Sequence, residues 1–338
     1  MSLDAASRPA GEPSSRAAPW SAADSPSAEL RPAAEPWPAA EPWPAAEPWS
    51  GAEPWSAAEP ASAPIWQPHE LWSPGYREWL PAAELRRTVT CFWVSVAPPG
   101  AGPSVTTVLP DGCSDLIWQS GRGAYVAGPD TGPAPAELPA GTVIVGARFR
   151  PGAGGPALGL PLAELRDARV DLTDCRPGLA RQLPADLSPR QALTRVTAVA
   201  AELAAGGPPD AAVLHGISLL AAGQTNVASL GPALSLSERQ LRRRFEQAAG
   251  YGPKTLQRVL RFRRLIRQLT VAPERPELAS LAIRLGYADQ SHLTRETTRL
   301  AGLPPAALAV RCRRISADAA GPLTAQALTA QALTTQGR

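Results

Sequence analysis

A polar stretch near the C-terminus repeats the plan of a segment that lies 52 residues earlier in the chain. The later segment reads LGYADQSHLTRETTRLAG over residues 285–302, and the earlier one reads SLSERQLRRRFEQAAG over residues 235–250. Ser237 and Asp289 stand at equivalent positions, and both are residue types that cap helix N-termini. The repeat therefore predicts two helices of similar design, one in each half of this region.

Each predicted helix has one apolar face and one polar face. Leu241, Phe245 and Ala248 fall at i, i+4 and i+7 and would pack on a partner, and Leu293 takes the position of Leu241. The outward positions hold side chains that can form hydrogen bonds: Arg239, Arg242 and Arg243 in the first copy, and Ser291, Thr294 and Arg295 in the second. A helix–turn–helix needs this combination, because one face holds the helix while the other reaches base edges.

Further helices complete each copy and join the two. We expect short or medium helices over residues 210–222, 227–234 and 278–285, with Asp210 as a cap and Gly286 as a stop. Between the copies, PKTLQRVLRFRRLIRQL over residues 253–269 predicts one helix of roughly 25 Å, at ~1.5 Å per residue. This connector would hold the two recognition helices apart, and successive major-groove segments on one DNA face lie ~34 Å apart.

The charge of the chain is divided unevenly. The formal net charge is only +3, but residues 208–315 carry 17 Lys and Arg against 7 Asp and Glu, a net of +10. Residues 1–207 carry a net of −7. A basic segment joined to an acidic one predicts a module that binds a polyanion, attached to a domain of another kind.

Residues 1–65 are rich in Pro, Ala, Ser and Glu. The pattern AEPWPA recurs every six residues and places tryptophans between its glutamates, at Trp37, Trp43, Trp49 and Trp55. Proline in every copy blocks a regular helix, so we expect an extended, disordered tail. Two interpretations stay open: a low-complexity segment without a partner, or a tail that docks on a partner through its tryptophans. We expect a second disordered tail over residues 316–338.

Residues 76–178 predict a compact β-rich domain. The runs RTVTCFWVSV, residues 87–96, and GTVIVGARFRPGA, residues 141–153, have the β-branched and aromatic content of strands. The run SVTTVLPDGCSDLIW, residues 104–118, predicts two strands around a Pro110-Asp111-Gly112 turn.

A helical segment is expected between the two domains. Residues 188–205 are compatible with a helix that has Ser188 as N-cap and Pro189 in its first position. We expect this helix to belong to a linker over residues 179–207, which ends at the Gly and Pro residues before Asp210.

At these residues the chain resembles the AraC/XylS family of bacterial transcription regulators. LSERQLRRRFEQAAGYGP and LAIRLGYADQSHLTRE…AGLPP are similar to the two halves of that family's DNA-binding domain. LPDGCSDLIW and GARFRPGA resemble, more weakly, a cupin-like domain of unknown role that precedes some such regulators. The resemblance implies a multidomain chain: a disordered tail, a β-rich cupin-like domain that senses an effector or dimerises, and an all-α DNA-binding domain at residues 208–315.

The resemblance also assigns DNA-binding residues. Arg239, Arg242 and Arg243 correspond to positions that face the groove, where arginine can bond bidentately to guanine. In the second helix the candidates are Gln290, Ser291, Thr294 and Arg295, although Gln290 could instead belong to the capping turn. On the connector, Arg258 and Arg261, together with Arg264, either hold phosphates or form a solvated face. His292 either meets a phosphate or is a plain surface residue.

Two departures from the family pattern bear on stability. Thr297 stands where the family usually has Phe, and a lost buried aromatic side chain costs about 1–3 kcal/mol. Gly231-Pro232 lies inside the predicted short helix of the first copy, where proline removes an intrahelical hydrogen bond.

Catalysis and metal binding find little support in the sequence. Asp111, Cys113 and Asp115 lie close together, but a cysteine nucleophile needs a base, and the nearest histidines, His69 and His215, fall outside the β-rich domain. With only three histidines and no CxxC pair, we expect no metal site and no cofactor. The default interpretation of this segment is a turn beside a core cysteine.

The preferred hypothesis is a cytoplasmic, DNA-binding transcription regulator that is not an enzyme and does not span a membrane. Its partner is double-stranded DNA, and the further candidate partners are a small-molecule effector, RNA polymerase and a second copy of the chain. One alternative is a DNA-targeted enzyme of the methyl-transfer repair type, which would need clustered cysteines. Another is an interaction protein that acts through its Trp repeat.

Overall fold

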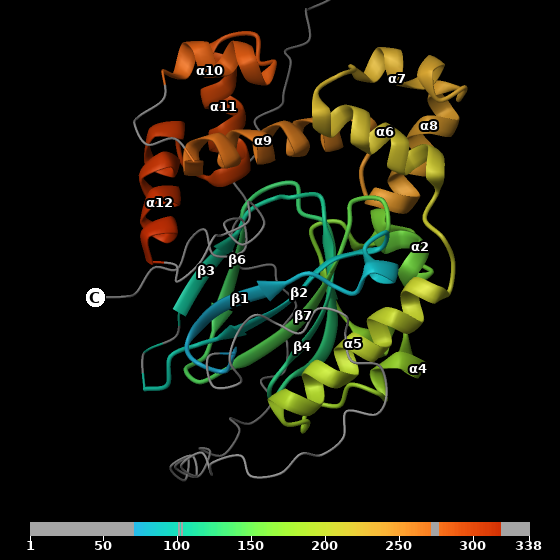
Figure 1. Cartoon of the computed structure of the whole chain (residues 1–338), viewed down its shortest axis with the longest axis vertical. Coiled ribbons are helices and arrows are strands. Elements are labelled where there is room, and N and C mark those ends of the chain that lie inside the picture. The colour runs from blue at the N-terminus through green and yellow to red at the C-terminus, as the bar shows by residue number, and fades with distance from the viewer. Residues whose placement is uncertain (1–70, 101, 103, 272–276, 319–338) are drawn as a thin grey trace, which may run out of the picture. The chain divides into compact units, whose positions relative to one another are not determined.

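The computed structural model describes residues 71–100, 102, 104–271 and 277–318, and all of them belong to one compact unit. The predicted tail at residues 1–65, with its Trp repeat, lies outside the described residues, as does most of the tail predicted at 316–338. The described chain forms a β-rich domain, residues 75–205, followed by a helical domain, residues 211–318 (Figure 1). The multidomain layout expected from the sequence is confirmed.

The β-rich domain is built on a six-stranded antiparallel sheet of order β1-β2-β7-β4-β5-β8, with β3 and β6 paired in a second sheet. The strands are β1 Gly75–Trp79, β2 Val89–Val96, β3 Ser104–Val108, β4 Ser114–Gln119, β5 Gly123–Ala127, β6 Ala134–Leu138, β7 Val143–Phe149 and β8 Arg169–Asp171. Its short helices are η1 Ala83–Leu85, α2 Gly154–Leu158, η2 Leu162–Leu165, α3 Leu172–Cys175 and α4 Pro177–Ala180.

The predicted strands all form, but the two strands around Pro110-Asp111-Gly112 do not pair with each other. β3 pairs with β6, whereas β4 pairs with β5 and β7. The segment between them is therefore a crossing from one sheet to the other. The side chain of Asp111 holds this crossing, because its Oδ1 accepts the backbone N–H of Cys113 at 2.8 Å.

The large sheet has apolar side chains on both faces, with the two-residue alternation of a strand. In β2, Phe92 and Val94 join the main core, whereas Cys91 and Trp93 join a smaller cluster on the other face, against which Leu138 of β6 packs. Gly146 lies opposite Trp93, and a Cβ at this position would overlap the indole ring. Burial on both faces explains why these strands read as nearly continuous apolar runs.

The segment predicted as a linker is part of the β-rich domain's core. Helix α5, Pro189–Ala205, begins with the expected cap: Ser188 accepts from the backbone of Gln191, and the Gln191 side chain accepts from the Ser188 N–H at 2.9 Å. Val196, Val199 and Leu203 of α5 are buried in the same cluster as the sheet. Its apolar stripe needs a surface to cover it, and the sheet supplies that surface.

The helical domain repeats one design on either side of a long helix. The helices are α6 Ala211–Ala222, α7 Val227–Ala233, α8 Glu238–Ala249, α9 Pro253–Val271, α10 Leu278–Leu285, α11 Gln290–Ala301 and α12 Pro305–Asp318. Figure 1 shows α6–α8 at one end of α9 and α10–α12 at the other. α8 and α11 are the two helices expected from the repeat, and each ends at a left-handed glycine, Gly250 and Gly302.

Helix α9 contributes to the cores of both copies. Leu256 and Leu260 are buried with Leu241 and Phe245 of α8, whereas Phe262, Leu265, Ile266 and Leu269 are buried with the apolar residues of α10–α12. One continuous helix therefore holds both copies, as the sequence predicted for the connector.

An ion pair joins α11 to α9. Nε and Nη2 of Arg258 donate to the two carboxylate oxygens of Glu296, at 2.5 and 2.9 Å, and both side chains are largely buried. Burial by itself raises the pKa of Glu296, but the hydrogen bonds and charge of Arg258 outweigh it and hold the pKa below its usual value.

The two departures from the family pattern are both accommodated. Thr297 is fully buried, and its hydroxyl donates to the carbonyl of Leu293, one turn earlier in α11, at 2.7 Å. Pro232 lies inside α7 as predicted, and the chain leaves the helix directly afterwards at Leu234.

Thr297→Val should raise the free energy of unfolding by about 0.5–1 kcal/mol, because a methyl group replaces a hydroxyl in an apolar site. The carbonyl of Leu293 is not orphaned, since it lies inside α11 and keeps its helical N–H partner. Thr298→Val is the matched control: its hydroxyl makes the same kind of bond, to Thr294 at 2.9 Å, but on an exposed side chain. Thermal melts compare the two variants. If Thr297→Val lowers the stability while Thr298→Val does not, the buried hydroxyl makes a net favourable contribution to the stability of the fold.

Glu296→Gln should lower the free energy of unfolding by roughly 1.5–3 kcal/mol at neutral pH, because Arg258 loses a charged hydrogen-bond partner. The folded-state pKa of Glu296 is depressed, so its contribution is complete above the unfolded pKa of about 4.3 and is lost as pH falls through the folded pKa. The two proteins should therefore converge in acid. Urea titrations from about pH 7 to about pH 3 measure this, with the exposed Glu164→Gln as control. A stability difference independent of pH would contradict it.

Candidate DNA-binding surface

The first turns of α8 place three arginines on the surface. Ser237 Oγ accepts the backbone N–H of Gln240 at 3.3 Å, and the Gln240 side chain accepts the N–H of Ser237 at 3.0 Å, so the helix has a fixed start. Arg239, Arg242 and Arg243 follow within two turns, and all three are exposed. The cap thus determines which way these side chains point.

The three arginines differ in what they already contact. Arg242 forms an i,i+4 pair with Glu246, with Nε 2.8 Å from the carboxylate and the arginine side chain 73% exposed. Arg239 and Arg243 have no ion pair or hydrogen bond within the described residues. The next residue, Arg244, points elsewhere and reaches Asp210, the cap of α6, at 3.3 Å. Arg239 and Arg243 are therefore the side chains that can take a new partner at least cost.

The start of α11 is held by a different cap. Asp289 Oδ1 accepts the N–H of His292 at 2.6 Å, and His292 Nδ1 accepts the N–H of Ala288 at 3.2 Å. The imidazole also meets the ring of Tyr287 edge-on, with 5.4 Å between the centroids. His292 is thus part of the capping turn, a role that its position in sequence did not reveal.

The predicted DNA-binding side chains of α11 lie just after this cap. Gln290, Ser291 and Arg295 are exposed, and the hydroxyl of Thr294 donates to the carbonyl of Gln290 at 2.9 Å. Ser291, Thr294 and Arg295 occupy the positions that correspond to the arginines of α8, whereas Gln290 corresponds to Glu238. The first set is almost wholly cationic, whereas the second offers mainly neutral hydrogen-bonding groups with one arginine.

The connector arginines do not form one solvated row. Arg258 is bound by Glu296, 38 residues away, so it would have to leave that pair to bind a phosphate. Arg261 lies over the ring of Tyr287, with its guanidinium carbon 5.1 Å from the centroid. Arg264 lies against Gly223 at the end of α6 and donates to the carbonyl of Leu285, at the end of α10, at 3.4 Å.

Arg261, Arg264 and Tyr287 form a half-buried cationic centre between the two copies. The Nε atoms of both arginines and the hydroxyl of Tyr287 are buried, with no hydrogen-bond partner in the described part of the chain. Burial and the neighbouring charge of Arg261 lower the pKa of Arg264, and burial raises the pKa of Tyr287 to about 12. A neutral phenol and two mutually repelling cations would all gain from an anion placed beside them.

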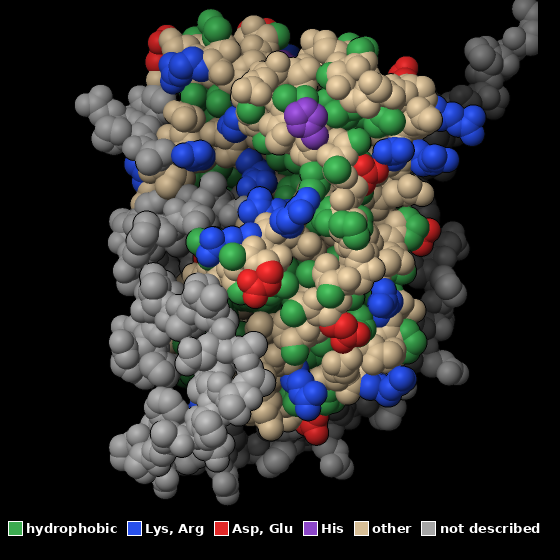
Figure 2. All heavy atoms as spheres, turned by 45° about the vertical axis from the view of Figure 1, so that its right-hand side comes forward, with side chains coloured by type: hydrophobic (Ala, Val, Ile, Leu, Met, Phe, Trp, Pro, Cys, Tyr) green, Lys and Arg blue, Asp and Glu red, His purple; other side chains and the backbone are tan. Residues whose placement is uncertain are grey.

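Figure 2 shows one face of the molecule, on which basic side chains gather in the upper part, over the helices. Acidic side chains are fewer there and stand mostly apart. This distribution agrees with the net charge of +10 on residues 208–315.

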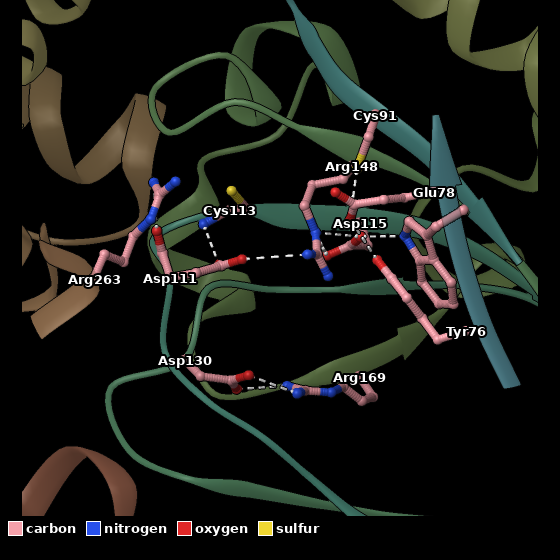
Figure 3. A network of polar contacts seen from close by, with 11 residues as sticks. Tyr76, Glu78, Cys91, Asp111, Cys113, Asp115, Asp130, Arg148, Arg169 and Arg263 are labelled. Carbon is pink, nitrogen blue, oxygen red and sulfur yellow. Dashed lines mark hydrogen bonds and ion pairs between the residues drawn. The ribbon is translucent and has the colours of Figure 1, made fainter. Parts of the chain in front are cut away.

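A buried charge network in the β-rich domain was not anticipated from the sequence. Figure 3 shows Arg148 between two carboxylates, with its Nε 3.0 Å from Asp115 Oδ1 and its Nη1 3.5 Å from Asp111 Oδ2. The indole N–H of Trp93 donates to the same Asp115 oxygen at 2.8 Å. Burial alone would lower the pKa of Arg148, but the two carboxylates raise it and keep the guanidinium charged. The sequence did contain an indication of this network, because Asp111, Asp115 and Arg148 all lie in the two segments that resemble a cupin-like domain.

This network ends at the helical domain. The backbone carbonyl of Asp111 accepts a hydrogen bond from Nη1 of Arg263, on α9, at 3.1 Å. Leu109, just before it, is buried among Phe262, Leu265 and other residues of the second copy's core. The crossing between the two sheets of the β-rich domain is therefore also a contact with the connector helix.

The cysteines do not have the environment of a nucleophile. Burial raises the pKa of all four thiols, to about 11 for Cys312, whereas an activated thiolate needs a depressed pKa. All four are free. Over the described ranges, no group of three or more His, Cys, Asp and Glu side chains could hold a metal ion. No described helix is both long and apolar enough to cross a membrane.

Two families match parts of the chain. Residues 230–311 match a family described as "Helix-turn-helix domain", and residues 77–171 match a "Domain of unknown function (DUF6597)". No curated protein matches the chain.

Solved structures of ToxT from Vibrio cholerae are similar to this chain. ToxT of strain O395 is 12% identical with a TM-score of 0.35, and the likeness covers 65% of this chain and 97% of that one. Wild-type ToxT of strain SCE256 with unsaturated fatty acid bound is 11% identical with a TM-score of 0.34, covering 64% and 94%. The match over residues 230–311 and the two helix–turn–helix copies on one connector show that the helical domain is a helix–turn–helix domain, as expected of a DNA-binding transcription regulator.

Proposed function

We propose that the chain is an AraC-type transcription regulator and that it binds its DNA site with α8 and α11 in successive major grooves. The observation that carries the proposal is that both helices start at fixed caps and present outward side chains at corresponding positions, Arg239 and Arg243 on one and Ser291 and Arg295 on the other. The N-terminal part of a recognition helix is the part that meets base edges. Both helices belong to cores that include α9, so this one continuous helix sets the distance between the two proposed groove contacts.

The half-buried cationic centre would hold a phosphate between the two grooves. Arg264 lies between the ends of α6 and α10, one from each copy, and Arg261 is its neighbour on α9. The buried Nε–H groups of both arginines and the hydroxyl of Tyr287 can each donate a hydrogen bond, and none has an acceptor within the described residues. A phosphate there would supply the missing acceptor and offset the repulsion between the two arginines. Such contacts supply affinity and register, whereas α8 and α11 supply sequence specificity.

A small-molecule effector remains part of the proposal, at a different place from that expected inside the β-rich domain. A cavity of about 220 Å³ is lined by residues of both domains, among them Thr131, Arg166, Thr255, Arg258 and Arg299. Its lining combines arginines with the carboxylate of Asp167, and Arg258 is already paired with Glu296, so it would suit a small polar ligand. RNA polymerase and a second copy of the chain stay predictions, as does any role of the Trp repeat.

The two recognition helices can be tested separately with the full chain on a site selected from random DNA. Arg243→Ala should relax base preference in one half of the site and Arg295→Ala in the other, each by about 1–3 kcal/mol at the affected base pair. The exposed Arg267 of α9 provides a control, Arg267→Ala. Repeated site selection gives the base preferences. If both variants lose affinity for every sequence equally, the arginines bind phosphates and α8 and α11 are not placed as proposed.

The phosphate role of the cationic centre predicts a change in salt dependence. Arg261→Ala should weaken binding to all sequences alike and reduce the slope of log affinity against log salt by about one. Arg261→Lys should restore the slope, since it keeps the charge, even though it stacks less well on Tyr287. Binding isotherms at several salt concentrations measure both. An unchanged slope in Arg261→Ala would place the phosphate elsewhere.

A further inference from the structure

A loop of the β-rich domain packs against the C-terminal end of α8 and lies beside the C-terminal end of α11. The loop has the sequence Pro-Asp-Thr-Gly-Pro over residues 129–133 and connects β5 to β6. At the end of α8, a Cβ on Gly250 would overlap Cγ of Pro129. At the end of α11, a Cβ on Gly302 would lie 3.7 Å from Cγ of Pro133. Gly250 and Gly302 are equivalent positions of the repeat, so one loop lies near the same point of both copies.

The contact with the first copy includes a directed bond. Tyr251 follows Gly250 and is fully buried, and its hydroxyl donates to the backbone carbonyl of Asp130 at 2.9 Å. On the other side, a Cβ on Gly132 would lie 3.9 Å from the carbonyl oxygen of Arg299 in α11. The two glycine-terminated helix ends leave room for the loop, because a side chain at Gly250 would collide with it.

The loop itself is held firmly by its own domain. The carboxylate of Asp130 accepts two hydrogen bonds from the guanidinium of Arg169 in β8, each at 2.7 Å (Figure 3). Asp167 accepts from the backbone N–H of Thr131 at 2.6 Å and from its hydroxyl at 2.8 Å. Proline at both ends restricts the backbone further. A loop fixed in this way can serve as a rigid spacer.

We propose that the 129–133 loop sets the spacing between the two recognition helices and so determines which half-site separation the regulator accepts. The inference rests on the proposed function, since it needs both helices to bind DNA. α9 joins the two copies on one side. On the other side the β-rich domain packs on α8 through α2, η2 and the loop, and it reaches α11 through the loop. Two connections fix a relative orientation that a single helix would leave free to bend or roll.

The test uses the full chain and DNA sites in which the two half-sites are separated by the native distance or by one base pair more or less. Two variants loosen the loop: Tyr251→Phe removes only the hydroxyl that bonds to Asp130, and Asp130→Ala releases the loop from Arg169. Both should reduce the ratio of native-spacing to altered-spacing affinity several-fold while base preference within each half-site stays unchanged. Asp171→Ala, which breaks the exposed pair with Arg122 in the same domain, should leave the ratio unchanged.

The outcomes separate the two proposals. If the wild-type protein protects both half-sites and prefers the native spacing, but both variants keep its ratio, the loop does not set the spacing. If the wild-type protein protects one half-site only, the use of two recognition helices fails, and the loop inference fails with it. Should Asp130→Ala not fold, as a thermal melt would show, Tyr251→Phe decides alone, because it changes one hydroxyl group.

Discussion

The burial of α9 is the constraint on which the helical domain depends. Its apolar residues are divided between two cores, with Leu256 and Leu260 in the first copy and Phe262, Leu265, Ile266 and Leu269 in the second. Each such side chain stabilises the fold by about 1.5–3 kcal/mol when it is fully buried. Neither copy can leave α9 without exposing part of this surface to water. The orientation of α8 and α11, and of the arginines on them, follows from how each packs on this one helix.

The β-rich domain meets the helical domain at sites that leave the first turns of α8 and α11 exposed. It contacts the C-terminal part of α8 through α2, η2 and residues 129–133, the end of α11 through residues 129–133, and α9 through Leu109 and the carbonyl of Asp111. The carboxylate of Asp111 pairs with the buried guanidinium of Arg148, which also pairs with Asp115. Burying an unpaired guanidinium would destabilise the fold by several kcal/mol, and the two carboxylates offset this desolvation penalty. The network holds the backbone at Asp111, and the carbonyl of this residue accepts a hydrogen bond from Arg263 of α9.

Local patterns in the sequence determined the elements well, because caps, glycine stops and apolar spacing act over a few residues. Ser188, Ser237 and Asp289 cap the helices expected of them, and Gly286 ends α10. Contacts between distant residues could not be predicted in this way. Nothing near Arg258 in sequence indicates Glu296, and nothing near Pro110 shows that β3 and β4 belong to different sheets. The packing of α5 on the large sheet could not be predicted either. It depends on which face of the sheet the rest of the chain leaves uncovered, and this is determined only in the folded protein.

The arginines illustrate how tertiary packing assigns different roles to one residue type. Residues 208–315 contain 17 Lys and Arg, and their charge alone indicates a polyanion partner. Packing then divides them: Arg258, Arg244 and Arg263 bind groups within the protein, whereas Arg239, Arg243 and Arg295 stay exposed on α8 and α11. Arg261 and Arg264 belong to neither set, because they are half-buried yet keep Nε atoms without a partner in the described structure. A buried donor without an acceptor costs free energy in the unbound protein. Part of the affinity for a phosphate at this centre would therefore come from relieving that cost, which a fully solvated arginine on α8 or α11 cannot contribute.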